Sequence, residues 1–175
     1  NNQDRLWVWN SDSNGVDFVG VDFVPGEWLH LALTHNGTTL TVYANGLLAG
    51  TVASGPTYLL NTVRDGVVFL GGSGRTDLSQ YFAGQIEEVR FWNAVVPQST
   101  LQEWMFRELD PAHPNYSSLA AYYQMNYQPV GFLADDSGKN HPGTLAGGMT
   151  EANFIASTVP FPTPTPQQTQ DSATT

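Results

Sequence analysis

The sequence of 175 residues contains no cysteine. Disulfide bonds, thiol catalysis and thiolate metal sites are therefore excluded, although the absence does not fix the cellular compartment. Basic side chains are also scarce, with 6 Lys and Arg against 16 Asp and Glu and a formal net charge of −10. So few positive charges cannot neutralise a phosphate backbone, which argues against nucleic acid as a partner.

Long apolar runs are missing as well. No stretch approaches the about 18 apolar residues that a transmembrane helix needs, so the sequence predicts no membrane span. The chain starts at Asn1 without an apolar leader close behind it, so we expect a processed product or a fragment. What is present is a globular composition, with 41% hydrophobic residues, 5 Trp, 7 Tyr and 9 Phe.

Short runs of β-forming residues alternate with turn signals along the chain. The clearest piece has apolar residues at alternating positions in 29–34 and 40–43, joined by Asn36-Gly37 and followed by Asn45-Gly46 and residues 47–52. Such two-residue turns suit the twist of antiparallel hairpins. The pattern predicts an all-β fold, an antiparallel sandwich with one buried face on each strand. Further strands are expected at 5–10, 16–24, 67–70, 81–93, 119–126 and 144–146.

Three local features interrupt the strand pattern. A capping box of Thr100 and Glu103 predicts one short amphipathic helix near residues 99–105. Ile86 and Val89 both have core character although they are three residues apart, which predicts a bulge around Glu87-Glu88. The composition of residues 160–175, rich in Pro and Thr, indicates a tail or linker.

Four stretches resemble, in order and spacing, motifs of the laminin-G-like or concanavalin-A-like jelly-roll superfamily, which includes the pentraxins. They are residues 26–34 (GEWLHLALT), 40–46 (LTVYANG), 82–93 (FAGQIEEVRFWN) and 99–105. Residues 119–123, 135–138 and 143–145 resemble segments that flank such domains. The resemblance implies an antiparallel jelly-roll sandwich with one short helix.

The resemblance also implies that early strands are missing, because domains of this family carry two or three strands before the point where this chain begins. We therefore expect a jelly-roll domain at residues 1–159, completed by residues 117–157 or by a neighbouring chain, and a Pro/Thr-rich tail or linker at 160–175. A sheet edge without its neighbour exposes main-chain donors and acceptors, which an added strand can satisfy.

Catalysis is not expected. The close acidic pair Glu87-Glu88 is adjacent in sequence, and neighbouring strand residues point to opposite faces. We expect Glu87 to make a structural hydrogen bond and Glu88 to be solvated. The 4 His show no metal-ligand spacing, and the resemblance places His30 at a position that packs within the sheet.

Calcium is the cofactor that the residues favour, because Ca2+ prefers carboxylate and carbonyl oxygens. Asp77 and Gln80 resemble two ligands of the pentraxin calcium site, although this loop is shorter. Asp12, Asp17, Asp135 and Asp136 are looser candidates. The alternative is that all of these acids are solvated loop residues.

Trp7 and Trp9 lie two residues apart and therefore share one strand face, where they could stack on a sugar ring. If a missing strand covers that face, they mark an interface instead. Asn36 and Asn115 begin N-glycosylation triplets, and Thr163 and Thr165 are candidates for O-glycosylation.

Two functions follow. The first is a non-enzymatic extracellular or cell-surface module for adhesion or structural assembly, which self-associates or binds another surface protein. In the sharper form of this hypothesis, the chain is a subunit of a polymer and its sandwich is completed by neighbouring chains. The alternative is a carbohydrate-binding, lectin-like module, with or without a dependence on calcium.

Overall fold

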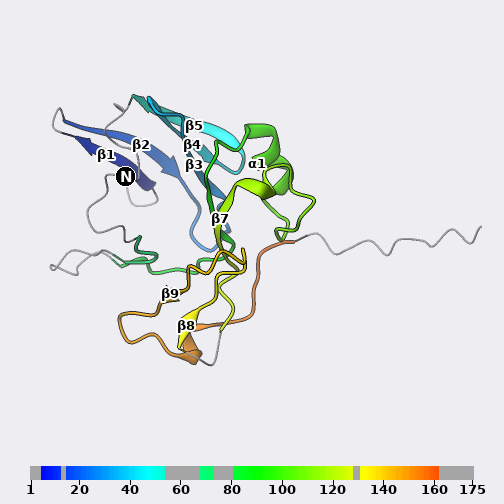
Figure 1. Ribbon diagram of the computed structural model, residues 1–175. Coiled ribbons are helices and arrows are strands. Elements are labelled where there is room, and N and C mark those ends of the chain that lie inside the picture. The colour runs from blue at the N-terminus through cyan, green and yellow to red at the C-terminus, as the bar shows by residue number, and fades with distance from the viewer. Residues whose placement is uncertain (1–4, 13–14, 54–67, 73–80, 128–130, 162–175) are drawn as a thin grey trace, which may run out of the picture.

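The computed structural model describes residues 5–12, 15–53, 68–72, 81–127 and 131–161 (Figure 1). For residues 5, 7–12 and 15–18 it describes the backbone alone. The elements are β1 (Arg5–Asp12), β2 (Gly15–Asp22), β3 (Leu31–His35), β4 (Thr39–Ala44), β5 (Leu47–Ala53), β6 (Val89–Trp92), α1 (Gln98–Trp104), η4 (Tyr116–Ser118), β7 (Leu119–Tyr123), β8 (Phe132–Leu133), β9 (Gly143–Thr144) and η5 (Glu151–Asn153).

All strand pairs are antiparallel. β1 pairs with β2, the strands β3, β4 and β5 form a three-stranded sheet in that order, and two smaller pairs join β6 to β7 and β8 to β9. The prediction of an all-β fold with antiparallel sheets and one short helix is thus confirmed, while the full jelly-roll topology is visible only in part.

The two predicted Asn-Gly turns are present. At the β4–β5 turn, Asn45 and Gly46 both have positive φ angles of 47° and 72°, which is the backbone that a two-residue hairpin turn of matching twist requires. At the β3–β4 turn, the Asn36 side-chain oxygen accepts hydrogen bonds from the backbone N–H groups of Thr38 and Thr39 at 3.0 and 2.9 Å. Asn therefore closes the turn through its own side chain.

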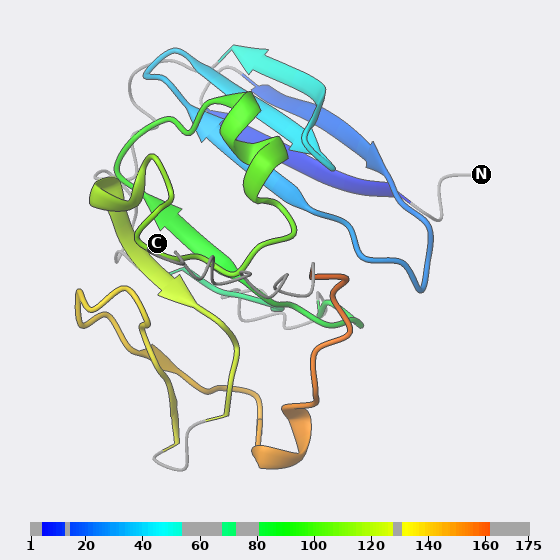
Figure 2. The same cartoon turned by 90° about the vertical axis from the view of Figure 1, so that its right-hand side faces the viewer.

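The first core lies between the β1–β2 hairpin and the β3–β5 sheet, which are stacked as two layers (Figure 2). Val19 and Val21 of β2 pack here with Val42 and Val52 of β4 and β5. Gly50 allows the close approach, because a Cβ atom there would lie 2.9 Å from a Val19 methyl group. Burial of these β-branched side chains holds the two layers together.

Strand β3 departs from the predicted pattern, which gave it one buried face. Leu31 and Leu33 are 37% and 50% exposed, although their register partners include the fully buried Val42. β3 is an edge strand of its sheet. The alternating pattern correctly predicted that Leu31 and Leu33 share the face on which Val42 lies. It could not show that the layer covering this face ends before the edge strand.

The second core packs α1 against the β6–β7 pair. Trp104 of α1, Leu109, Leu119 and Tyr122 are buried together, with Trp92 of β6 packed against them. This cluster fixes the helix on the molecule, since α1 has only 7 residues and a helix that short is not stable alone.

Several predicted elements were wrong in extent. Residues 68–70 of the expected strand 67–70 form no strand, and the expected strand 119–126 ends at Tyr123. In the expected strand 81–93, only Val89–Trp92 is strand, and Tyr81 makes a single bridge with Gly72. The backbone of Glu88 has a positive φ of 56°, which breaks the strand where the bulge was expected. Helix α1 begins at Gln98 after Pro97, with no side-chain cap. The predicted capping box is not formed there, because Thr100 is buried inside the helix.

The chain beyond β7 forms a separate region away from β1–β5 (Figures 1 and 2). β7 belongs to the stretch 117–157 and pairs with β6, whereas β8 and β9 pair with each other. From η5 the chain runs back toward the sandwich as far as residue 161. No helix among the described residues is long and apolar enough to cross a membrane.

Candidate functional site

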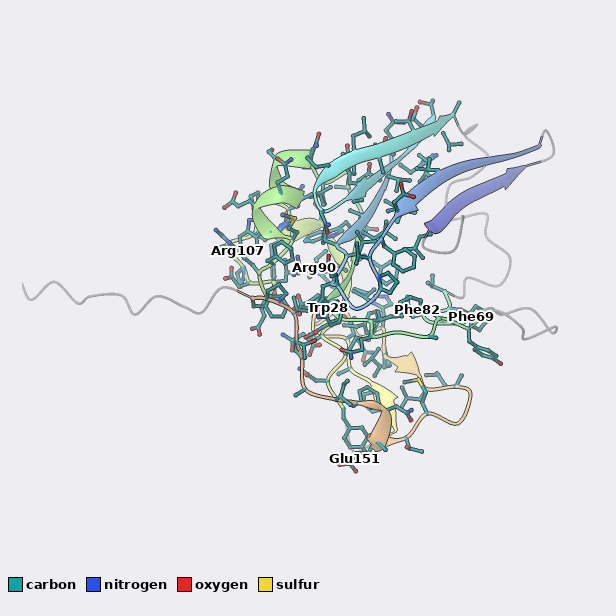
Figure 3. The ribbon with its side chains drawn as sticks, turned by 180° about the vertical axis from the view of Figure 1, so that it is seen from behind. Trp28, Phe69, Phe82, Arg90, Arg107 and Glu151 are labelled. Carbon is teal, nitrogen blue, oxygen red and sulfur yellow. The ribbon has the colours of Figure 1, made fainter. Side chains whose placement is uncertain are left out.

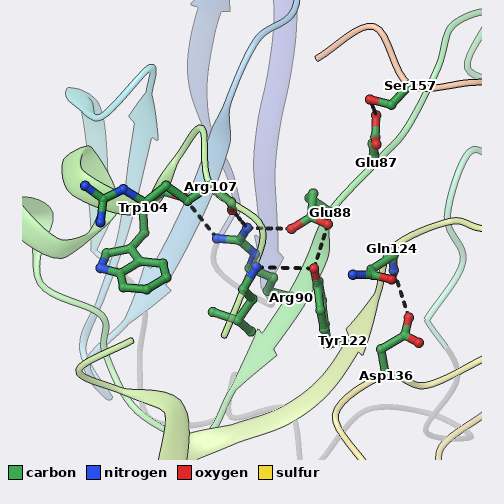
Figure 4. Close-up of polar contacts among 10 residues, drawn as sticks. Glu87, Glu88, Arg90, Trp104, Arg107, Tyr122, Gln124, Asp136 and Ser157 are labelled. Carbon is green, nitrogen blue, oxygen red and sulfur yellow. Dashed lines mark hydrogen bonds and ion pairs between the residues drawn. The ribbon is translucent and has the colours of Figure 1, made fainter. Parts of the chain in front are cut away.

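An ion pair with little solvent exposure lies where β6 meets β7. The Arg90 Nη2 atom is 2.6 Å from the Glu88 Oε2 atom, and the Tyr122 hydroxyl donates to the Glu88 Oε1 atom at 2.6 Å (Figure 4). The side chains of Arg90 and Glu88 are only 12% and 13% exposed. Burial and the Glu88 contact raise the pKa of the Tyr122 hydroxyl above its usual range.

The same guanidinium also closes the end of α1. Its Nη1 atom donates to the Trp104 carbonyl at 3.1 Å, and Nη2 donates to the Arg107 carbonyl. The last carbonyls of a helix lack partners within the helix and carry partial negative charge. Arg90 therefore ties α1 to β6, with Glu88 balancing its charge.

The roles expected for the two adjacent glutamates were wrong for Glu88. Glu88 is half-buried and uses both carboxylate oxygens for Arg90 and Tyr122. Glu87 accepts a hydrogen bond from the Ser157 hydroxyl at 2.6 Å. The left-handed backbone at Glu88 turns its side chain inward, and strand alternation could not anticipate this conformation. Glu87 and Glu88 are both engaged in structural contacts.

A buried histidine fills the second core. His113 is 4% exposed, and its ring stacks on Trp92 with centroids 4.6 Å apart and meets the edge of Trp104 at 4.8 Å. Its Nδ1 atom accepts a hydrogen bond from the Asn115 backbone N–H at 3.0 Å. Burial, followed by the charge of Arg90, lowers its pKa. His113 is thus held as a neutral core residue.

His30 was predicted to pack within the sheet. In the structure, His30 is half-buried and lies directly before β3. Its backbone N–H donates to the Asn45 side chain at 2.9 Å. Burial and, to a smaller extent, Arg90 lower the pKa of His30 to about 4. A ring that is neutral near pH 7 is consistent with a structural role.

Asp135 is another structural carboxylate, with a side chain only 2% exposed. Its Oδ1 atom accepts from the backbone N–H groups of Tyr122 and Ser137, both at 3.0 Å, and Oδ2 accepts from that of His141 at 2.9 Å. Burial alone would raise the pKa, but the hydrogen bonds from Ser137, Tyr122 and His141 outweigh it and lower the pKa to about 2. Asp135 therefore holds the turn after β8 against the backbone of β7.

A hollow of about 110 Å³ lies between the end of β2 and the β4–β5 turn. Its lining combines an aromatic ring with carboxylate and amide groups from Asp22, Phe23, Val24, Glu27, Trp28, Leu29 and Asn45. The Trp28 Nε1 atom donates to the Thr158 hydroxyl at 2.9 Å. The hollow thus has the mixture of an apolar wall and convergent polar groups that small ligands use.

Large apolar side chains are exposed around the Gly72–Tyr81 bridge. Phe69 and Phe82 are 55% and 50% exposed, Leu70 is 43% exposed and Tyr81 is 64% exposed. Figure 3 shows Phe69 and Phe82 on the side of the molecule away from Arg107. We call these four side chains the aromatic patch. The sequence placed them on core strands, so it did not mark them as a surface.

Several of the predicted sites fall partly or wholly outside the described residues. Asp77, Gln80, Thr163 and Thr165 lie outside them. Trp7 and Trp9 pair in register with Gly20 and Phe18, but their side chains are not among those described. The stacking role, the calcium ligands and the O-glycans remain predictions.

The two N-glycosylation triplets lie in different surroundings. Asn36 is exposed at the β3–β4 turn, and Asn115 is half-buried just before η4. Among the described residues, no three His, Asp or Glu side chains are grouped as a metal site. The carboxylate oxygens of Asp135 already accept backbone hydrogen bonds, and Asp136 accepts one from Gln124 at 3.2 Å. Calcium binding therefore remains a prediction.

Comparison with known proteins gives one family. The model of the Concanavalin A-like lectin/glucanases superfamily matches residues 1–102. Mouse Pappalysin-1 is 35% identical over 78 residues, which are 43% of this chain and 5% of that protein. The Pentraxin fusion protein of Xenopus laevis is 29% identical over 140 residues, which are 75% of this chain and 31% of that protein. The chain thus spans less than a third of either relative.

A solved structure shares the fold. It is that of a Bacteroides ovatus protein described as carbohydrate-binding, with a TM-score of 0.59 and 24% sequence identity. The match covers 78% of this chain and 39% of that one.

Proposed function

Because the chain belongs to the concanavalin A-like lectin/glucanases superfamily, we propose that it is a non-enzymatic module for adhesion or structural assembly outside the cell. In the sharper form of the proposal, it is a subunit of a polymer in which neighbouring chains complete the sandwich. Its partner is a second copy of the chain or another surface protein.

The observation that carries this proposal is the exposed apolar surface. The aromatic patch exposes four large side chains from the two segments that meet at one β-bridge, and exposed patches of this kind mark interaction sites in soluble proteins. Edge strand β3 adds Leu31 and Leu33, which face the interior of the sandwich but remain partly uncovered. An added strand or a second protein would bury both features.

The chemistry of the acidic pair supports a non-enzymatic role. A general acid or base needs a carboxyl group that can reach a substrate proton. Both oxygens of Glu88 are held by Arg90 and Tyr122, and Glu87 is bonded to Ser157.

Light scattering of the chain over a range of concentrations tests the proposal. We expect the mass to rise above the 19.1 kDa of one chain as the concentration increases. The double variant Phe69→Ser/Tyr81→Ser should remain at the mass of one chain, because it removes two exposed rings from the aromatic patch.

Leu48→Ser is the matched control, because Leu48 is 57% exposed but lies on β5. It should associate as the natural chain does, and circular dichroism should show all variants folded. The proposal would be contradicted if the natural chain keeps the mass of a single chain at every concentration and no partner is captured from its own source. Negative-stain microscopy of material from the natural source then distinguishes a polymer from a single adhesive module.

The hollow beside Trp28 supports a second candidate, which is carbohydrate binding with calcium. An aromatic ring beside Asn45 and two carboxylates offers both a stacking face and hydrogen-bonding groups for a sugar. The solved structure with the same fold is described as carbohydrate-binding. A glycan array with and without a chelator tests it. Binding that is lost in Trp28→Ala supports this candidate, and no binding in either condition rejects it.

A further inference from the structure

The C-terminal stretch of the described chain lies against the sandwich instead of ending at η5. We call residues 155–161 the strap. Its two hydroxyl residues contact positions far away in sequence: Ser157 donates to the Glu87 carboxylate at 2.6 Å, and Thr158 accepts from the Trp28 indole at 2.9 Å (Figure 4 shows the first contact). Trp28 precedes β3 and Glu87 precedes β6, so the strap bridges the segments that lead into these two strands.

The receiving groups are complementary to the strap in hydrogen bonding. Trp28 can only donate through its indole N–H, whereas an ionised Glu87 can only accept. The strap meets them with neighbouring hydroxyls, of which Ser157 donates and Thr158 accepts. A hydroxyl can donate or accept, so each strap hydroxyl can meet the requirement of its partner. The two bonds together tie the strap to both Trp28 and Glu87.

The strap is nevertheless held weakly. Ser157 and Thr158 are both exposed, and Ile155 is 62% exposed. The backbone hydrogen bonds recorded for the strap stay within it, such as that from Phe161 N–H to the Val159 carbonyl at 2.8 Å. Each exposed side-chain hydrogen bond contributes only about 1 kcal/mol. The two hydrogen bonds are therefore a weak tie, alongside the half-buried residues Val159 and Phe161.

The strap also has a place where it can separate from the region before it. Phe154, which precedes the strap, packs on Tyr127 with ring centroids 5.4 Å apart, and η5 is closed by the reciprocal bonds of Thr150 and Asn153. The anchor thus ends at Phe154, and residues 155–156 link it to the two bonded hydroxyls.

We propose that the strap binds the Trp28–Glu87 site of a second copy of the chain, so that copies in an assembly exchange their straps. The contacts made to a second copy are the same as those made within one chain, so exchange costs little beyond association itself. Assembly through the aromatic patch would raise the local concentration of a neighbour's site and favour exchange. This inference rests on the proposed assembly function, and it adds the segment by which copies are linked.

The absence of cysteine from the chain permits a direct test. The full chain is prepared as two single variants, Glu87→Cys and Ser157→Cys, which are mixed and treated with a short bismaleimide cross-linker. A link between positions 87 and 157 can form in this mixture only between different chains. We expect a product of twice the 19.1 kDa chain mass, with peptides around both positions joined in mass spectrometry, and several-fold less of it when Trp28→Phe is added to the Glu87→Cys chain.

The control pair is Glu103→Cys and Arg107→Cys, because the natural side chains at these positions form an exposed ion pair at 3.4 Å. Their mixture should give no comparable product, because α1 is not exchanged. If the natural chain self-associates in light scattering but the product linked through positions 87 and 157 stays at the level of this control, strap exchange is wrong and the assembly proposal stands. If no self-association occurs at all, both fail.

Discussion

The carboxylate of Asp135 joins the turn that follows β8 to the backbone of β7. It accepts three backbone hydrogen bonds, from Tyr122, Ser137 and His141, while the Asp136 N–H donates back to the Tyr122 carbonyl at 2.7 Å. Charged acceptors make stronger hydrogen bonds than neutral ones. One nearly buried side chain thus ties the segment between β8 and β9 to β7.

Replacing this carboxylate tests its contribution. Asp135→Asn places an N–H donor where one oxygen now accepts from an N–H group, so we expect the free energy of unfolding to fall by about 2 kcal/mol or more. Asp136→Asn is the control, since the Asp136 side chain accepts a single long bond from Gln124 at 3.2 Å. In this control the free energy of unfolding should fall by less than about 1 kcal/mol. If urea unfolding shows the same loss of stability in both variants, the hydrogen bonds to Asp135 contribute no more than the single bond to Asp136.

The sequence could identify Asp135 only as part of a motif, and it misjudged Glu88. Alternation along a strand assumes an extended backbone, whereas Glu88 has a φ of 56°. Its inward orientation depends on Arg90 and on Tyr122, which is 34 residues away in sequence. Residues whose roles come from such long-range partners cannot be assigned from local patterns.

At the scale of elements, helix α1 is hydrogen-bonded to the β4–β5 turn. Gln98 and Gln102 both donate their side-chain amides to the Gly46 carbonyl, at 2.9 and 3.0 Å. A Cβ atom on Gly46 would lie 2.6 Å from the Gln102 Cγ atom. The turn therefore needs glycine for its positive φ of 72° and for the approach of the helix.

A double-mutant cycle separates these two requirements. Gly46→Ala should destabilise the chain by about 2 kcal/mol, and adding Gln102→Ala should recover part of that loss because it removes the clashing atom. Gly37→Ala is the matched comparison: its φ is 101°, but no atom lies within 4 Å of the added Cβ. Its effect should simply add to that of Gln102→Ala in thermal or urea unfolding. Additivity at Gly46 as well would rule out the clash.

Local signals placed the hairpins well and the element ends less well. Asn-Gly turns carry their own backbone preference, so β3, β4 and β5 were found at nearly their true positions. The start of α1 follows its contacts with Gly46 and the core, and the Thr100 capping box is not used. The extent of β6 was likewise overestimated, since pairing with β7 limits it to four residues.

For the whole molecule, composition and motif order predicted the fold class and the family, because both depend on the pattern of many residues. The aromatic patch was not predicted. Phe69 and Phe82 have the character of core residues, and their exposure depends on which layers surround them. The same holds for Leu33, which occupies a core-facing position at an uncovered edge.

The last prediction concerns the stability of the whole chain in acid. A histidine whose pKa is lower in the folded state than in the unfolded state makes the unfolded chain bind more protons, so stability falls as the pH decreases. The pKa of His30 is about 4 in the folded chain, against the ordinary 6.5. Through this group the chain should lose stability between about pH 6.5 and 4. His113 acts in the same direction. Asp135, with a pKa of about 2 against 3.8, adds a further loss below that range.

Net charge acts in the opposite direction, because the charge of −10 at pH 7 shrinks as the pH approaches the isoelectric point near 4.4 and self-repulsion falls. Urea unfolding should therefore be measured in high salt, which screens exposed charges more than buried groups. Between pH 7 and 4.5 we expect the free energy of unfolding to fall by about 2 kcal/mol through His30, and His30→Gln should flatten this slope. A profile as steep in His30→Gln as in the natural chain would assign the acid sensitivity to other groups, His113 first among them.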